Sequence, residues 1–143
     1  MFGDQAPPLS DDDLIEFAVG PHQDMDGNPM YPFPVDGIEF ELFWRPATGP
    51  SVISLIRLAH HVSGAMPAIE VAAALGVGSV RKLAHVIQRA EKFHMAAFVP
   101  PHEPGKPARL LVIRRAPLPM ASSARKIPAS LRPAFKVFVD AAR

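Results

Sequence analysis

Basic and polar side chains gather on one side of a predicted helix between residues 79 and 93. Counted from Arg81, they recur at spacings of 1, 4, 7, 8 and 11, which places them on one helical face. The members of this basic face are Arg81, Lys82, His85, Gln88, Arg89 and Lys92. The other face carries Val80, Leu83 and Ile87, and Ser79 can cap the helix. A row of donors with few acids beside it is suited to binding an anionic partner.

The charge of the chain is unevenly distributed, although its net value is only +1. Residues 1–50 hold ten acidic residues against Arg45 alone, a charge of −9, whereas residues 51–143 hold fourteen Lys and Arg against four acids, a charge of +10. A basic body of this strength indicates a polyanionic partner. The acidic front is interpreted as a packed cover for the domain, an arm that binds a partner, or an internal competitor for the basic face.

The segments on either side of the basic face must position it. The apolar run "SVISLIRLAHHV" after Gly49-Pro50 predicts a central buried helix. A shorter helix begins at Pro67, and "LGVGS" breaks the pattern before the basic helix. Residues 95–99 and 108–115 predict two strands around the loop 100–107, which makes an open hairpin. Lys106 and Arg109 lie near the tip of that hairpin.

The two ends of the chain give weaker patterns. Ser10 to Asp13 matches a capping box and predicts a short helix over 11–19, followed by an irregular connector over 21–34. The alternation in "GIEFELFW" predicts a half-buried strand over 38–44. A proline-rich connector over 116–128 precedes a last helix. Its narrow apolar stripe consists of Leu131, Phe135, Phe138, Val139 and Ala142.

The order of strand, helix, short helix, turn, longer helix and hairpin resembles the winged helix-turn-helix superfamily. "VAAALGVGSVRKLAHVIQRAEKF" is similar to its helix-turn-helix, and "MAAFVPPHEPGKPARLLVIRR" is similar to its wing. "FELFWRPATGPSVISLIRLA" together with "RKIPASLRPA" resembles small, largely uncharacterised actinobacterial winged-helix proteins. The resemblance implies a mostly α protein with a small β component (α+β). Its parts are an acidic N-terminal segment (1–36), a winged domain (37–115) and a C-terminal connector and helix (116–143).

The resemblance implies a bacterial protein that binds double-stranded DNA and regulates transcription. A helix fits the major groove, so Arg81 and Lys82 in the first turns can donate to guanine beside Ser79 and His85. Gln88 can bridge to adenine, while Arg89 and Lys92 lie further along and suit phosphates. The wing, with Lys106 and Arg109, is expected on the DNA backbone or in the minor groove.

Three alternatives stay open at this point. Winged-helix folds also serve as protein-interaction adaptors that do not bind DNA, and here the acidic front or the last helix would hold the partner. A small-molecule sensor would require a cavity. The stripe of the last helix either folds back on the central helix or pairs with a second copy, and a homodimer is favoured because winged-helix regulators commonly dimerise in this way.

Other function classes find little support in the sequence. His60 and His61 are adjacent and cannot chelate as an i, i+4 pair would, and the chain has no cysteine, so no metal site is expected. No phosphate loop or nucleophile motif is present, so neither an enzyme nor a cofactor is predicted. No apolar run is long enough to span a membrane, and the first residues do not resemble an export signal. A cytoplasmic, nucleoid-associated protein is therefore expected.

Overall fold

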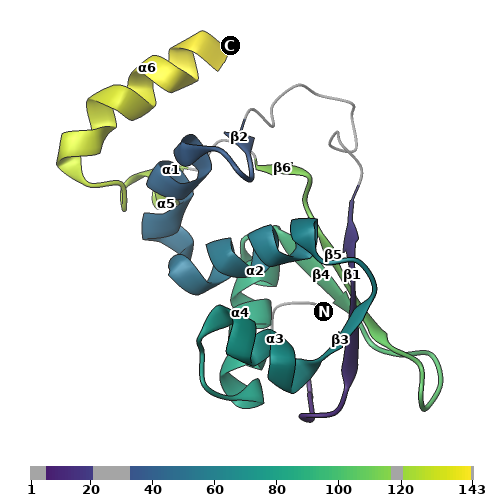
Figure 1. Cartoon of the computed structure of the whole chain (residues 1–143). Helices are drawn as coiled ribbons and strands as arrows, with labels where there is room; N and C mark the ends of the chain where they lie inside the picture. Colours follow the sequence, from purple (N-terminus) through teal and green to yellow (C-terminus); the bar gives the residue numbers. More distant parts are fainter. Residues whose placement is uncertain (1–5, 21–32, 117–120, 143) are drawn as a thin grey trace.

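A computed structural model describes residues 6–20, 33–116 and 121–142 (Figure 1). Its helices are α1 (Ile38–Thr48), α2 (Pro50–His61), α3 (Ala68–Leu75), α4 (Val80–Lys92), α5 (Ala121–Ala124) and α6 (Arg132–Ala142), with a short 3-10 turn, η1 (Ala129–Leu131). Its strands are β1 (Leu14–Val19), β2 (Phe33–Pro34), β3 (Ala65–Pro67), β4 (Ala96–Val99), β5 (Ala108–Val112) and β6 (Arg115–Ala116). The chain is therefore an α+β protein, as predicted. None of the helices in these ranges is long and apolar enough to cross a membrane.

The main sheet contains a strand that the sequence did not predict. Its order is β3-β1-β5-β4, with β1 antiparallel to β3 and parallel to β5, so that Phe17 lies opposite Leu110. Ile15 and Phe17 are buried while Glu16 between them is partly exposed, which is the period of a strand. The predicted helix over 11–19 is therefore wrong.

The supposed capping box serves a different helix. Ser10 and Asp13 form a closed turn, in which the Asp13 N–H donates to the Ser10 carbonyl (3.1 Å) and the Ser10 N–H donates to Asp13 Oδ2 (2.8 Å). The carbonyls of Asp13 and Asp11 accept from the first two N–H groups of α3, at Ala68 (2.7 Å) and Ile69 (3.0 Å). These groups have no partner within α3, so the acidic turn caps α3 and leads into β1 instead of starting a helix.

The strand predicted over 38–44 is also wrong, because these residues lie in helix α1. Its buried side chains, Phe40, Phe43, Trp44 and Ala47, follow the helical spacing of i, i+3, i+4 and i+7. Ile38, in contrast, is 58% exposed. The apparent alternation came from apolar residues on both sides of the helix. Gly49, with φ of +88°, then turns the chain into α2.

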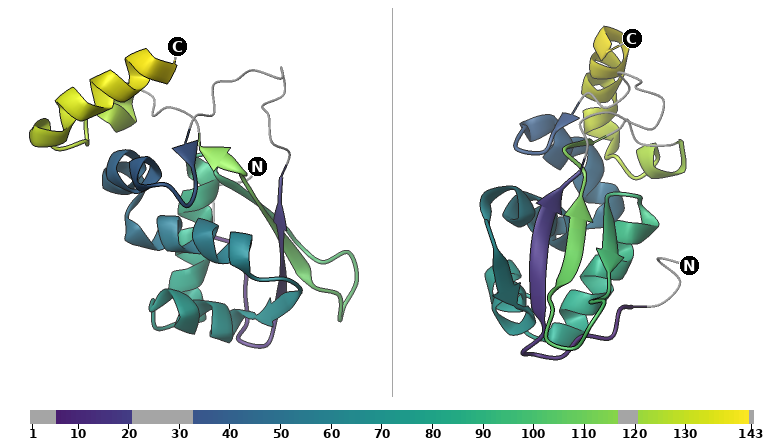
Figure 2. Two further views of the ribbon diagram at one scale, coloured as in Figure 1. Left: turned by 45° about the horizontal axis from the view of Figure 1, so that its top comes forward. Right: turned by 90° about the vertical axis from the view of Figure 1, so that its right-hand side faces the viewer.

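The helices from α2 to α4 agree with the prediction. α2 buries Val52, Ile53, Leu55, Ile56 and Ala59, and it packs against α1, α4 and β1 at the centre of the fold. α3 begins after Pro67 and ends at Gly76, whose left-handed conformation (φ of +71°) breaks the helix. The sheet covers one side of this helical layer (Figure 2).

The hairpin is confirmed as well. β4 and β5 pair antiparallel, with Phe98 opposite Leu110, and they enclose the loop 100–107. Met95, Phe98 and Leu110 are buried in the core that α2, α4 and β1 share. The hairpin is therefore fixed to the helices at its base and extends outward at its loop (Figure 1).

The C-terminal part lies beside α1. The last helix is confirmed as α6, and it extends away from the helices and the main sheet (Figures 1 and 2). Phe135 contacts Phe43 edge-to-face, with ring centroids 5.1 Å apart, whereas Val137 is 70% exposed. The side chains of Phe138, Val139 and Ala142 lie outside the described part, as do 21–32 and 117–120 of the two predicted connectors.

Candidate nucleic-acid interface

The local sequence of α4 explains both its start and its orientation. Ser79 is the N-cap, and its Oγ accepts from the Lys82 N–H at 3.2 Å. Val80, Leu83, Ala84, Ile87 and Ala90 are buried against the rest of the fold. Burial of this stripe turns the opposite side of the helix outward, as the spacing predicted.

Four of the predicted interface residues form a solvent-facing group. Arg81, Lys82, His85 and Lys92 are all exposed on the outer side of α4. Within the described ranges none of their side chains has a carboxylate partner. We refer to these four residues as the open face of α4. Its positive charge is available to a partner in solution.

Ser79 and Gln88 are less available than these four residues. The Ser79 hydroxyl already serves as the helix cap, although an oxygen that accepts one hydrogen bond can still donate another. Gln88 is half-buried and interacts with the protein itself.

Arg89 is bound to the end of α1. Its Nη2 donates to the Ala47 carbonyl (2.9 Å) and its Nε to the Thr48 carbonyl (2.5 Å), the last carbonyls of that helix. The guanidinium also lies over the Phe93 ring, 5.5 Å from its centroid. Positive charge at a helix C-terminus is favourable, so Arg89 fastens α4 to α1. Arg89 is exposed on the same side of α4 as the open face, but α1 already engages its guanidinium.

The hairpin loop lies at the same end of the molecule as the start of α4. His94, with φ of +59°, is part of the turn that reverses the chain after α4. β4 then runs back along the helix, and the buried Glu91 accepts from the Phe98 N–H at 3.2 Å. The loop 100–107 and the first turn of α4 consequently lie near one end of the fold (Figure 1).

The two basic residues of the hairpin differ in their surroundings. Lys106, in the loop, is exposed and has no acidic partner in the part of the chain that the structure describes. Arg109, on β5, is exposed but lies 3.7 Å from Glu16 Oε1 on the neighbouring strand β1. This pair could not be predicted from the sequence, because it depends on β1 lying beside β5.

Part of the acidic N-terminal segment packs at this end. Pro8, Leu9 and Leu14 line a small hollow of about 160 Å³ together with residues of the hairpin, among them Phe98 and Lys106. Asp11, Asp12 and Asp13 are exposed and form no ion pair with a basic residue of the described ranges. Among the described residues, the segment therefore packs beside the loop end of the hairpin and leaves the open face of α4 exposed.

The described histidines do not lie in a cluster suited to a metal ion. No group of three or more His, Asp or Glu side chains suited to a metal ion occurs in residues 6–20, 33–116 and 121–142. His60 is bonded through Nε2 to the carbonyl of Ile113 at 2.8 Å.

Comparison with known proteins does not favour one of the functions considered for this chain over another. No protein-family model matches the chain, and no curated protein or solved structure matches it.

Proposed function

We propose that this protein binds double-stranded DNA and regulates transcription, and that the first turns of α4 enter the major groove. The observation that carries the proposal is the open face of α4. Arg81, Lys82 and His85 extend into solvent from the first two turns, opposite the buried stripe of Leu83 and Ile87. Side chains at the start of such a helix reach base edges, and arginine or lysine donates to guanine.

The order of the elements supports a winged-helix arrangement for this role. α2, β3, α3, α4 and the β4–β5 hairpin follow one another as helix, short strand, two helices and wing. One feature differs from the winged-helix arrangement expected from the sequence: β1 comes from the N-terminal segment and lies between β3 and β5. The departure concerns the sheet, and among the described residues it leaves the open face of α4 uncovered.

Contacts with the DNA backbone are supported for only some of the predicted residues. Lys106 is free to meet phosphates from the wing, and Lys92 can meet them from the far end of α4. Arg109 must first release Glu16, and Arg89 must release two carbonyls of α1. We therefore assign the phosphate contacts to Lys92 and Lys106. A protein with this function is located at the nucleoid.

The test is a salt-titrated binding assay with random duplex, followed by selection of the bound sequences. The logarithm of affinity should fall by about 0.9 per neutralised phosphate against the logarithm of salt concentration. Arg81→Ala should relax base preference and cost about 1–3 kcal/mol at a selected site.

The matched control removes the same charge elsewhere. Arg125 and Lys126 are exposed beyond α5, on the part of the chain that carries α6. The double variant Arg81→Ala/Lys82→Ala should abolish site-specific binding, whereas Arg125→Ala/Lys126→Ala should retain it. Equal affinity in the two double variants would overturn the assignment of α4 as the reader.

A second candidate function is an adaptor that binds protein, and α6 favours it. This helix extends from the fold with Val137 70% exposed, a surface suited to a second copy of the chain or another protein. Light scattering of the full chain and of Val137→Asp shows whether α6 pairs with a second copy of the chain. A dimer that the substitution disrupts supports pairing through α6, and a monomer at all concentrations rules that pairing out.

A further inference from the structure

A second cationic region lies on α2, and none of its residues belongs to α4 or to the hairpin loop. It is an open cleft of about 500 Å³ between α2, the segment 34–36 and Arg114, one of the two residues between β5 and β6. Its polar lining consists of Arg57, His60, His61, Arg114 and Asp36. Asp36 is the only acid among the described lining residues, so positive charge predominates in the cleft.

The spacing on α2 places three of these side chains together. Arg57, His60 and His61 stand at i, i+3 and i+4, which is one face of a helix. The other side of α2 is occupied by core residues such as Val52, Leu55 and Ile56. The same helix therefore supports the core on one side and the cleft on the other.

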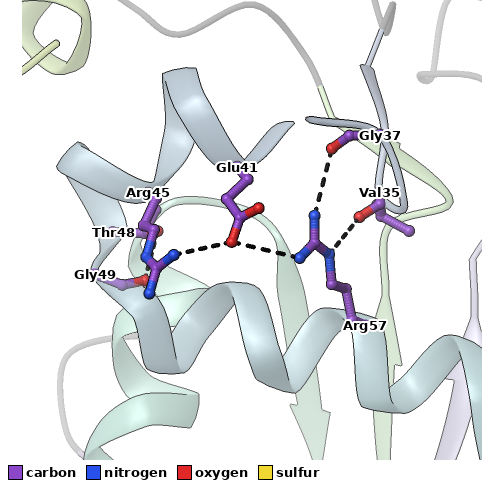
Figure 3. Close-up of polar contacts among 7 residues, drawn as sticks. All are labelled: Val35, Gly37, Glu41, Arg45, Thr48, Gly49 and Arg57. Atoms are coloured by element: carbon purple, nitrogen blue, oxygen red, sulfur yellow. Dashed lines mark hydrogen bonds and ion pairs between the residues drawn. The ribbon is translucent and has the colours of Figure 1, made fainter. Parts of the chain in front are cut away.

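Arg57 is held in a fixed position at this cleft. Its Nε donates to the Val35 carbonyl (2.9 Å) and its Nη2 to the Gly37 carbonyl (3.3 Å), and its side chain is 31% exposed (Figure 3). Its Nη1 lies 3.7 Å from Glu41 Oε1, an oxygen that also accepts from Arg45 at 2.9 Å. Glu41 is thus shared between two arginines and neutralises neither of them fully. An arginine fixed in this way loses little conformational freedom when it binds a ligand.

His60 is fixed as well, and its hydrogen-bonding role can be assigned. A carbonyl oxygen only accepts, so Nε2 must carry the hydrogen that is directed to Ile113 O, 2.8 Å away. Arg114 and His61 are exposed and have no ion pair with any residue that the structure describes. The N–H of His60 is used in its bond to Ile113 O, so His60 orients the wall of the cleft and does not donate to a ligand. The cleft thus combines one anchored donor, Arg57, with two side chains, His61 and Arg114, that can adjust to a ligand.

We propose that this cleft binds a small molecule through an anionic phosphate or carboxylate group. Arginine matches both groups with paired N–H donors, and the volume is that of a site for a metabolite-sized ligand. Asp36 at the rim suits a hydroxyl or amino group elsewhere on the same molecule. The proposal does not depend on DNA binding, because none of the cleft residues belongs to the open face of α4.

The test follows backbone and arginine side-chain NMR resonances of the full chain during titration with inorganic phosphate and, separately, with citrate. Binding at the cleft should shift the resonances of Arg57, His60, His61 and Arg114 in a saturable manner. A response to phosphate alone identifies a phosphate ligand, and a response to citrate alone identifies a carboxylate ligand. Shifts that stay linear with both anions would overturn the proposal.

Two double variants distinguish binding at the cleft from nonspecific attraction of anions to the protein. His61→Ala/Arg114→Ala removes the two exposed donors and spares Arg57, whose hydrogen bonds maintain the fold. It should weaken binding at least about tenfold, since hydrogen bonds to charged groups are among the strongest in proteins. Arg125→Ala/Lys126→Ala should bind as the unchanged chain does. Equal weakening in both would contradict the proposal. Duplex binding by His61→Ala/Arg114→Ala reports separately on the proposed function.

Discussion

The two cationic regions, on α4 and on α2, use similar residues in different ways. Arg81 and Lys82 on α4 are exposed and have no acidic partner among the described residues, whereas Arg57 on α2 is bonded to two backbone carbonyls. Arg89 belongs to α4 in sequence, yet it behaves as Arg57 does because the end of α1 lies within its reach. The position of an arginine relative to backbone acceptors therefore decides whether it maintains the fold or serves a partner.

The largest contrast should be between the two sides of α4. Ile87 is fully buried among the core residues, so Ile87→Ala should lower the free energy of unfolding by about 2–5 kcal/mol. Lys92→Ala on the open face should change it by less than about 0.5 kcal/mol. Urea denaturation measures both. A similar loss in the two variants would mean that the open face is packed and not free.

The next contrast lies between two arginines of the same helix. Arg89→Ala removes two hydrogen bonds to the carbonyls of α1 and should cost about 2 kcal/mol of stability. Arg81→Ala should leave stability unchanged within about 0.5 kcal/mol and should weaken duplex binding instead. Arg89→Lys, which keeps the charge but loses the paired geometry, should lie between them. Equal stability of the two alanine variants would remove the distinction between anchored and free arginines.

Substitutions of Ser79 distinguish its role as a helix cap from a role in duplex binding. Ser79→Ala should cost about 1 kcal/mol, because the Lys82 N–H loses its acceptor. Ser79→Asp should keep the cap and the stability, since aspartate is an equally good cap beside the positive end of the helix. Its negative charge should nevertheless weaken duplex binding. Unchanged duplex affinity in Ser79→Asp would indicate that the start of α4 does not approach DNA.

The smallest effect concerns Arg109. Its pair with Glu16 is exposed and 3.7 Å long, so Glu16→Gln should change stability by less than about 0.5 kcal/mol. The freed guanidinium should raise duplex affinity slightly and steepen its salt dependence. Arg109→Gln should have the opposite effect on affinity. No difference between the two in salt titrations would exclude Arg109 from the interface.

The segments that the sequence predicted correctly are those whose partners are near in the chain. α4 shows its buried stripe and its cap within thirteen residues, and β4 and β5 are joined by one loop. The open face followed from the same spacing. The attachment of Arg89 could not be predicted, because its acceptors at Ala47 and Thr48 are about forty residues away in the sequence.

The wrong predictions have the same cause, because the contacts that decide these segments lie far away in the sequence. Ser10 to Asp13 is a local turn in either case, and only the distant α3 shows which helix it caps. Residues 38–47 contain the spacing of Phe40, Phe43, Trp44 and Ala47, but Ile38 and Leu42 hide it by imitating a strand. The cleft on α2 joins residues near 35, 57 and 114, and no local pattern in the sequence connects them.

The position of β1 has a consequence for how the chain folds. β1 is made well before its parallel neighbour β5, which follows the other strands of the main sheet in the chain. One edge of β1 can pair with β3 early, but the edge that faces β5 stays unpaired until that strand is made, and it is open to association with other nascent chains. Completion of the sheet must therefore await closure of a very long loop, which makes this step the slow one. A solubilising fusion ahead of β1 should accordingly improve the yield of folded protein more than one placed after α6.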